Sequence, residues 1–194
     1  MTKTVALFVT CLVDMMRPRI GFAAIRALKA AGCDVVVPEG QTCCGQPALN
    51  SGDRDHAAAI AKQTIMALEA YEAIVVPSGS CAGTIRCHYP EIFEHDAEWL
   101  PRAQAVAGRT FEIMAYLDEM LGWKPEGVRI DARATYHDSC SGLRELGVKA
   151  QPRRLLKQIE GTRKRRSPPW RKAHGANCVR RCWARMSAYR APIS

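Results

Sequence analysis

The sequence of 194 residues lacks several signatures that would assign it to a common class of protein. It has no run approaching the ~18 consecutive apolar residues that a membrane-spanning helix needs, so no membrane span is expected. It has neither Gly-x-Gly-x-x-Gly nor a phosphate-binding loop, so a bound nucleotide or flavin is not indicated. No Ser–His–Asp set and no catalytic pair of carboxylates is recognisable either. These absences argue against nucleotide chemistry and against acid–base hydrolysis.

Acidic residues are missing from the C-terminal part of the chain. Residues 162–194 hold ten Lys and Arg and no Asp or Glu, whereas residues 1–161 hold 18 Lys and Arg against 19 Asp and Glu. The net charge of +9 therefore comes from the last segment, and the rest of the chain is close to neutral. Because the basic run at residues 163–166 has neither interleaved aromatic residues nor a recognisable binding fold, it does not indicate a specific nucleic-acid partner.

Cysteine, in contrast, is abundant, with nine residues. The N-terminal MTKTVALFVTC has a short apolar run but no small-residue cleavage site after it, so we interpret it as a first strand rather than as an export signal. We accordingly expect a cytoplasmic protein with reduced thiols. In that setting many cysteines indicate metal or redox work rather than a disulfide scaffold.

Short β-rich apolar runs alternate with amphipathic segments along residues 1–161. The expected strands cover residues 4–10, 34–37, 73–76 and 133–137. The expected helices cover residues 20–31, 53–71 and 151–160, and residues 97–121 are expected to be mostly helical, with breaks near Pro101 and Gly108. This alternation predicts an α/β fold, a parallel sheet with flanking helices. In such sheets the functional crevice lies beyond the carboxyl ends of the strands.

Four cysteines fall in the loops that follow three of these strands. Their pattern is Cys11-x31-Cys43-Cys44-Gly45-x35-Cys81. Thiolates are the ligands of iron–sulfur clusters, normally four for one [4Fe–4S] centre. Gly45 lets the backbone approach closely because it has no Cβ. We therefore expect these four cysteines to bind one iron–sulfur cluster of the [4Fe–4S] type.

Zinc is an alternative to the iron–sulfur cluster, and several other residues need an interpretation of their own. Zinc is the alternative metal, but structural zinc sites favour short Cys-x2–4-Cys pairs, and the gaps here are long. Cys33 and Cys87 are interpreted as buried structural cysteines, with Cys87 also a candidate spare ligand. His137 and Asp138 lie beside Cys140 and are candidates to tune or support a redox centre. Asp138 has a second interpretation, as the cap of the following helix.

The pattern at the beginning of the sequence is repeated in the segment that starts near residue 126. Cys11 and Cys140 each follow an expected strand, precede a helix and lie 21 residues before a glycine, Gly32 or Gly161. The second copy lacks a Cys-Cys-Gly, so Cys140 is the start of an incomplete second site. We hypothesise that a shifted reading frame encodes the basic tail. The expected divisions are a first unit at 1–125, the beginning of a second unit at 126–161, and a tail at 162–194 that is not natively folded.

Four segments carry a resemblance to a known family: CLVDMMRP (11–18), TCCGQPALNSG (42–52), PSGSCAG (77–83) and YHDSCSGLRELGV (136–148). They resemble the cysteine-rich CCG-domain iron–sulfur proteins. That family includes the cysteine-rich subunit of heterodisulfide reductase, the iron–sulfur subunit of glycolate oxidase, and the small iron–sulfur subunit of the bacterial lactate-utilisation complex. The chain looks most like the last of these. The resemblance implies two CCG units in one α/β fold, with Cys11, Cys43, Cys44 and Cys81 as the ligands of the first site.

The resemblance also implies a role and partners. The chain would be an electron-transfer subunit of a lactate-oxidising complex rather than a complete enzyme. Its partners would be the other iron–sulfur subunits and, indirectly, a quinone or another acceptor. The chain would be cytoplasmic, and its complex would allow it to lie at the inner face of the membrane as a peripheral protein.

One residue departs from the pattern of heterodisulfide reductase. That pattern ends in Cys-x-x-Cys and uses five cysteines, whereas Thr84 stands three residues after Cys81 here. A four-ligand cluster is therefore the expectation. A heterodisulfide-reductase-like subunit, a glycolate-oxidase-like subunit and a zinc-stabilised basic binding module remain the alternatives.

Overall fold

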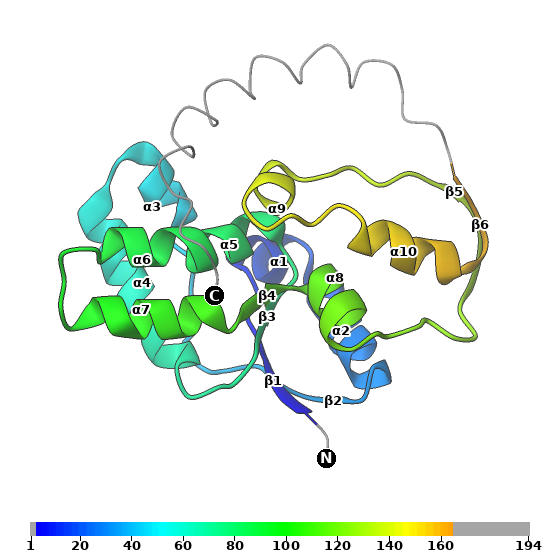
Figure 1. The fold of residues 1–194 in the computed structure, drawn as a ribbon, viewed down its shortest axis with the longest axis horizontal. Coiled ribbons are helices and arrows are strands. Elements are labelled where there is room, and N and C mark those ends of the chain that lie inside the picture. The colour runs from blue at the N-terminus through cyan, green and yellow to red at the C-terminus, as the bar shows by residue number, and fades with distance from the viewer. Residues whose placement is uncertain (1–2, 165–194) are drawn as a thin grey trace, which may run out of the picture.

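The structure, a computed structural model, describes residues 3–164. At its centre is a parallel four-stranded sheet in the order β2-β1-β3-β4 (Figure 1). Its strands are β1 (Lys3–Leu7), β2 (Cys33–Val36), β3 (Ile74–Val76) and β4 (Thr110–Glu112). Helices flank this sheet on both faces, so the predicted α/β fold with a parallel sheet is confirmed.

Alternate residues of the central strands build two hydrophobic cores. Ala6 and Phe8 of the β1 segment face one core, whereas Val5 and Leu7 face the other, and all four are fully buried. The first core is completed by α4 (Arg54–Leu68), α5 (Gly79–Gly83), η1 (Thr84–His88), α6 (Tyr89–Ile92) and α7 (Trp99–Gly108). The second is completed by α2 (Pro18–Ala30), α8 (Ile113–Ala115), η2 (Tyr116–Met120) and α10 (Gln151–Gln158). Because helices cover both faces, consecutive residues of β1 and β3 are buried, rather than every second one.

Three local expectations were wrong. In the mostly helical stretch expected over residues 97–121, α7 ends at Gly108 as expected but is not broken at Pro101, and the residues after it form the strand β4, which pairs with β3. Cys81 lies within the short helix α5 rather than in a loop. The loop that carries the Cys-Cys-Gly sequence also contains α3 (Gln46–Ser51). Helices of five or six residues have too few turns to produce a periodic pattern, which explains why they were missed.

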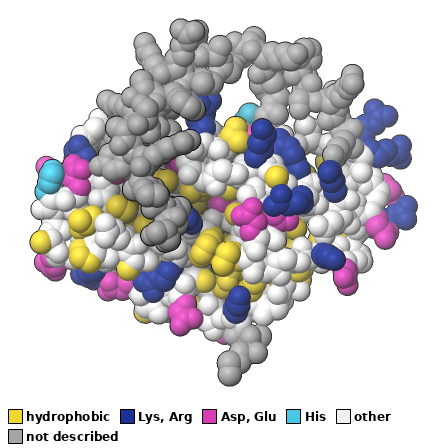
Figure 2. Space-filling view, viewed as in Figure 1, with side chains coloured by type: hydrophobic (Ala, Val, Ile, Leu, Met, Phe, Trp, Pro, Cys, Tyr) yellow, Lys and Arg dark blue, Asp and Glu magenta, His cyan; other side chains and the backbone are white. Residues whose placement is uncertain are grey.

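The segment from residue 126 repeats part of this arrangement in a separate two-stranded sheet. β5 (Arg129–Ala134) and β6 (Glu160–Lys164) pair in parallel, as β1 and β2 do. Between them lie α9 (Cys140–Arg144), which begins at Cys140 as α1 (Cys11–Met16) begins at Cys11, and then α10. Figure 2 shows Lys and Arg side chains gathered on the part of the molecule where these elements lie. The division into two units stays a prediction.

The strand β6 extends to Lys164, three residues into the segment expected to be an unfolded tail. The remaining expectations for that tail, the shifted frame and the absence of a native fold, concern residues 165–194 and lie outside the described residues. Within residues 3–164, no helix has the combination of length and apolar character that crossing a bilayer requires.

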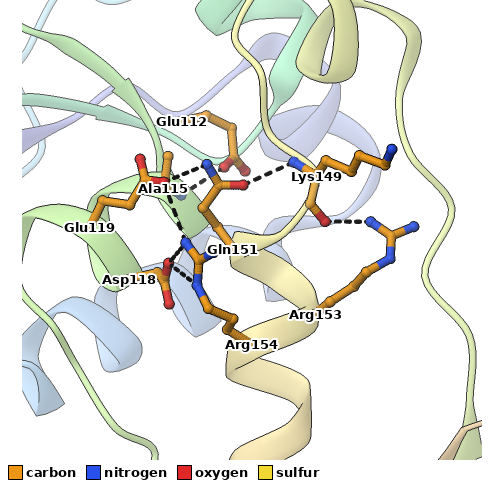
Figure 3. A network of polar contacts seen from close by, with 8 residues as sticks. All are labelled: Glu112, Ala115, Asp118, Glu119, Lys149, Gln151, Arg153 and Arg154. Carbon is orange, nitrogen blue, oxygen red and sulfur yellow. Dashed lines mark hydrogen bonds and ion pairs between the residues drawn. The ribbon is translucent and has the colours of Figure 1, made fainter.

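Two contacts fasten the second segment to the first. The short helix α5 packs against α9 where glycines face each other: a Cβ on Gly79 would lie 3.0 Å from the Cα of Gly142. Polar contacts join α10 to η2, since Arg154 pairs with Asp118 and Gln151 donates to Glu119 at 2.7 Å (Figure 3). The cysteine-bearing helices α5 and α9 are thereby held side by side.

Candidate metal centre

The four predicted cysteine ligands come together at the carboxyl edge of the sheet. Cys11 begins α1 just after β1, Cys43 and Cys44 follow β2, and Cys81 lies in α5 just after β3. The chain leaves β1 toward β2 on one side and then crosses to β3 on the other. The site therefore lies at the point where the strand order reverses, which is where open α/β sheets place their ligands.

The thiols form two close pairs of different exposure. The Sγ atoms of Cys11 and Cys43 are 3.6 Å apart, and both residues are half-buried. The thiol of Cys44 donates to the sulfur of Cys81, and these residues are 2% and 8% exposed. A cavity of about 420 Å³ borders Cys11 and Cys43. The site thus has a buried pair, a half-exposed pair and open space beside the latter.

The thiols influence one another's ionisation. Burial, followed by the hydrogen bond with Cys43 and the neighbouring charge of Cys81, raises the pKa of Cys11. The hydrogen bond with Cys81, together with burial, raises the pKa of Cys44 strongly. The same bond, with further bonds from Ser78 and Ser80, lowers the pKa of Cys81 to about 6 against the opposing effect of burial. Cys81 is therefore favoured as a thiolate, which is the form that binds metal.

A glutamine holds the first pair of loops in place. The side chain of Gln41 accepts a hydrogen bond from the Val9 backbone N–H at 2.7 Å. It donates to the carbonyls of Leu7 and Pro38, at 3.0 and 2.9 Å. Gln41 thus links the segments after β1 and β2, which carry Cys11 and Cys43.

Two side chains from helices hold the Cys-Cys backbone. The hydroxyl of Thr64 in α4 donates to the carbonyl of Cys43 at 3.2 Å, and the hydroxyl of Tyr89 in α6 donates to that of Cys44 at 3.1 Å. Tyr89 is fully buried. Sequence analysis missed Gln41, Thr64 and Tyr89 because no short motif links them to the cysteines; they are brought there only by folding.

Gly45 has a backbone conformation that favours glycine. Its φ is 80°, in the left-handed region, at the start of α3. A Cβ there would meet Ile60 and the carbonyl of Ala57 at 3.5 Å, which is ordinary contact. The backbone angle, rather than crowding within the chain, therefore accounts for glycine at this position.

The second segment contributes differently from the expectation. Cys140 is exposed at the start of α9. That helix is capped by Ser139, whose hydroxyl accepts from the N–H of Gly142 at 3.1 Å, so the capping interpretation of Asp138 was wrong. Asp138 instead pairs with Arg153, with Asp138 Oδ2 2.8 Å from Arg153 Nη2. His137 is exposed.

The two cysteines interpreted as structural lie apart from the four-thiol set. Cys33 is 6% exposed in β2 and packs in the second core, as expected. Cys87 is half-buried in η1, and burial raises its pKa to about 11. Neither residue contributes to the two thiol pairs described above.

The four cysteines form a set of thiol donors at one edge of the sheet. Within residues 3–164 no three His, Cys, Asp or Glu side chains are arranged to hold one metal ion. A four-iron cluster makes a different demand, because its four thiolates bind four iron atoms and need not converge on one point. Four thiols from three strand ends, beside an open cavity, provide the donor set for such a group.

His88 gives the contact between the two segments a dependence on pH. Its ring nitrogens lie 2.8 Å from Glu91 and 3.6 Å from Glu145, and the bond to Glu145, then that to Glu91, raises its pKa to about 9 against the opposing effect of burial. Because this value lies above the ordinary 6.5, the stabilisation is complete below pH 6.5 and is lost as the pH rises through about 9.

We therefore expect the free energy of unfolding to fall by about 1–2 kcal/mol more in the unmodified chain than in His88→Gln over that pH range, after allowance for solvent screening. Urea titrations at several pH values measure this difference. Parallel pH curves for the two proteins would show that His88 does not contribute.

Comparison with known proteins gives relatives over most of the chain. Residues 5–86 match the family described as the cysteine-rich domain, CCG. The chain is 45% identical over 157 residues to Lactate utilization protein A of Macrococcus caseolyticus (strain JCSC5402), and 44% identical over 160 residues to Lactate utilization protein A 2 of Bacillus cereus (strain Q1). These alignments cover 81% of this chain but 64% and 65% of the relatives, so the chain spans somewhat less than two thirds of their length.

Proposed function

Because the chain carries a CCG cysteine-rich domain and is a relative of the lactate utilization A proteins, we propose that it binds an iron–sulfur cluster and transfers electrons in lactate utilisation. The observation that carries the proposal is the meeting of Cys11, Cys43, Cys44 and Cys81 at the reversal point of a parallel sheet. Four thiolates are the usual ligand set of a [4Fe–4S] centre.

Two of the four cysteines would bind each side of such a centre. Cys44 and Cys81 would bind its buried side, where Tyr89 fixes the backbone of Cys44. Cys11 and Cys43 would bind its half-exposed side, which borders the cavity. When bound, an iron–sulfur cluster supplies a group that gains and loses single electrons. The half-exposed side is the approach for a partner that exchanges them.

The proposed role is that of an electron-transfer subunit rather than a complete lactate-oxidising enzyme. Its proposed partners are the other iron–sulfur subunits of a lactate-utilisation complex, with a quinone or another carrier as the eventual acceptor and the cytoplasm as the location. A five-thiolate centre of the heterodisulfide reductase type is not proposed. The position of its fifth cysteine is held by Thr84, which is buried and donates to the carbonyl of Ser80 at 3.0 Å.

Metal analysis after anaerobic reconstitution tests the proposal. We expect about four iron and four sulfide per chain, no zinc, and an electron paramagnetic resonance signal in the reduced sample. Zinc alone would favour a structural metal module. A folded chain that takes up neither metal would overturn the proposed function.

A further inference from the structure

A second cavity, of about 410 Å³, lies at the carboxyl ends of β3 and β4 on the face covered by α2 and α8. Its remaining wall comes from the segment that leads into and follows α9, including Tyr136, Ser139 and Val148. Its volume is within the range of about 300–1,000 Å³ that small-molecule sites occupy. The metal centre does not use this cavity.

The lining is largely apolar, with a few polar groups. Helix α2 contributes small side chains, among them Ala24 and Ala27, and the other face of the space is formed by Ile113 and Leu117. Among the described residues that line it, Glu112 is the only Asp, Glu, Lys, Arg or His. Such a space, apolar with a few convergent polar groups, is the usual form of a binding site for a small organic molecule.

Glu112 presents one oxygen to this space. Its Oε2 accepts from the N–H groups of Met114 and Ala115, at 2.8 and 3.1 Å, and the contact with Ala115 is drawn in Figure 3. Its Oε1 has no hydrogen-bond partner among residues 3–164. No enclosed side-chain oxygen in that range lacks a partner, so Oε1 is accessible from outside the chain, although the residue as a whole is only 8% exposed. Glu112 is one of the residues that line the cavity.

We propose that this cavity binds a small, uncharged molecule with an apolar body and a carbonyl-type oxygen, which accepts a hydrogen bond from the protonated carboxyl of Glu112. The apolar walls favour the body of such a molecule by removing it from water. An anion is disfavoured, because the described wall has no Lys, Arg or His side chain to neutralise its charge. Lactate, which is small, charged and polar, is therefore not the ligand of this cavity.

The position of the cavity connects it with the metal centre. Ser78 and Gly79 line it, and they shortly precede Cys81 in the chain. A molecule bound there lies beside the helix that carries a proposed ligand. Binding itself does not depend on the proposed function and is tested without metal, so failure of either proposal leaves the other standing.

The test uses the full chain and calorimetric titration with 2-acetylnaphthalene, an uncharged ketone with a flat apolar body, compared with 2-naphthoate and with lactate. We expect the ketone to bind with a dissociation constant below about 1 mM, and at least about tenfold more tightly than either anion. Ala27→Leu fills the cavity from α2 and should weaken ketone binding by at least about tenfold. Ala30→Leu, an exposed site on the same helix outside the lining, is the matched control and should leave binding unchanged.

The pH dependence of ketone binding shows whether the ketone accepts a hydrogen bond from Glu112 or only fills the cavity. Burial raises the pKa of Glu112 to about 7, and the other titratable side chain on the wall is Tyr136, whose pKa is also raised by burial. Ketone binding should therefore weaken as the pH rises through about 7. In Glu112→Gln, whose amide still donates and still accepts from Met114, binding should persist without that dependence.

Three outcomes would overturn the proposal: no ketone binding by the unmodified chain, equal binding by Ala27→Leu and Ala30→Leu, or the same pH profile in Glu112→Gln as in the unmodified chain. Circular dichroism establishes that each variant is folded before it is compared.

Discussion

Replacing Cys81 by serine is expected to remove nearly all bound iron, from about four atoms per chain to fewer than about one after anaerobic reconstitution. Cys81 is buried and takes a hydrogen bond from Cys44, which lowers its pKa to about 6 and favours the thiolate. A serine hydroxyl in the same place offers neither a soft donor nor an easily formed anion. The iron and sulfide contents of the two proteins, prepared side by side, give the result.

Cys87→Ser is the matched control for this experiment. Cys87 lies six residues further along, in η1, and is half-buried, but it is outside the two thiol pairs. Its replacement should leave the iron content unchanged. If Cys81→Ser kept its full iron, or if Cys87→Ser lost as much, the assignment of ligands would be wrong.

Gly79→Ala should have the second large effect, on the packing of the two segments. The added Cβ would lie 2.6 Å from the hydroxyl oxygen of Ser139 and 3.0 Å from the Cα of Gly142. Since one of these neighbours is backbone, α9 must move away, and we expect a loss of about 1–3 kcal/mol in the free energy of unfolding. Urea titration measures the loss, and hydrogen exchange of the α9 amides reports where it arises.

Gly108→Ala provides the comparison. Gly108 ends α7, and a Cβ there would have nothing within 4 Å. Alanine should therefore be neutral or stabilise the chain by up to about 1 kcal/mol, because glycine loses more conformational freedom on folding. Equal stability of Gly79→Ala and Gly108→Ala would mean that the close approach of α5 and α9 does not matter for folding.

Sequence patterns predicted the amphipathic helices and the strands that stand out as short apolar runs. The helix α2 and the strands β1, β2 and β3 lie within two or three residues of their expected bounds. Strand β4 was missed because its three residues follow α7 directly, and only pairing with β3 makes them a strand. Tertiary contacts, rather than local preference, decide such short elements.

The candidate site was likewise predictable only as far as local sequence patterns reach. The cysteines could be proposed as a set because each follows a strand, and parallel strands bring their carboxyl ends to one edge. The division of that set into a buried and a half-exposed pair could not, since it depends on which helices cover Cys44 and Cys81. The hydrogen bonds of Gln41 and Tyr89 could not be predicted either, because they join residues that are 32 and 45 positions apart in the sequence.

The hydrogen bonds of Gln41, Thr64 and Tyr89 have a consequence for the stability of the chain without bound metal. They tie the cysteine loops to strands and helices through protein atoms alone, and the sheet has its own two cores. In zinc fingers the metal is part of the folding free energy, so its removal unfolds the domain. In this chain we expect folding not to depend on the proposed metal, because the thiols are gathered by contacts that form when the chain folds. An emptied chain should therefore keep its shape and be refilled repeatedly, without passing through an unfolded state.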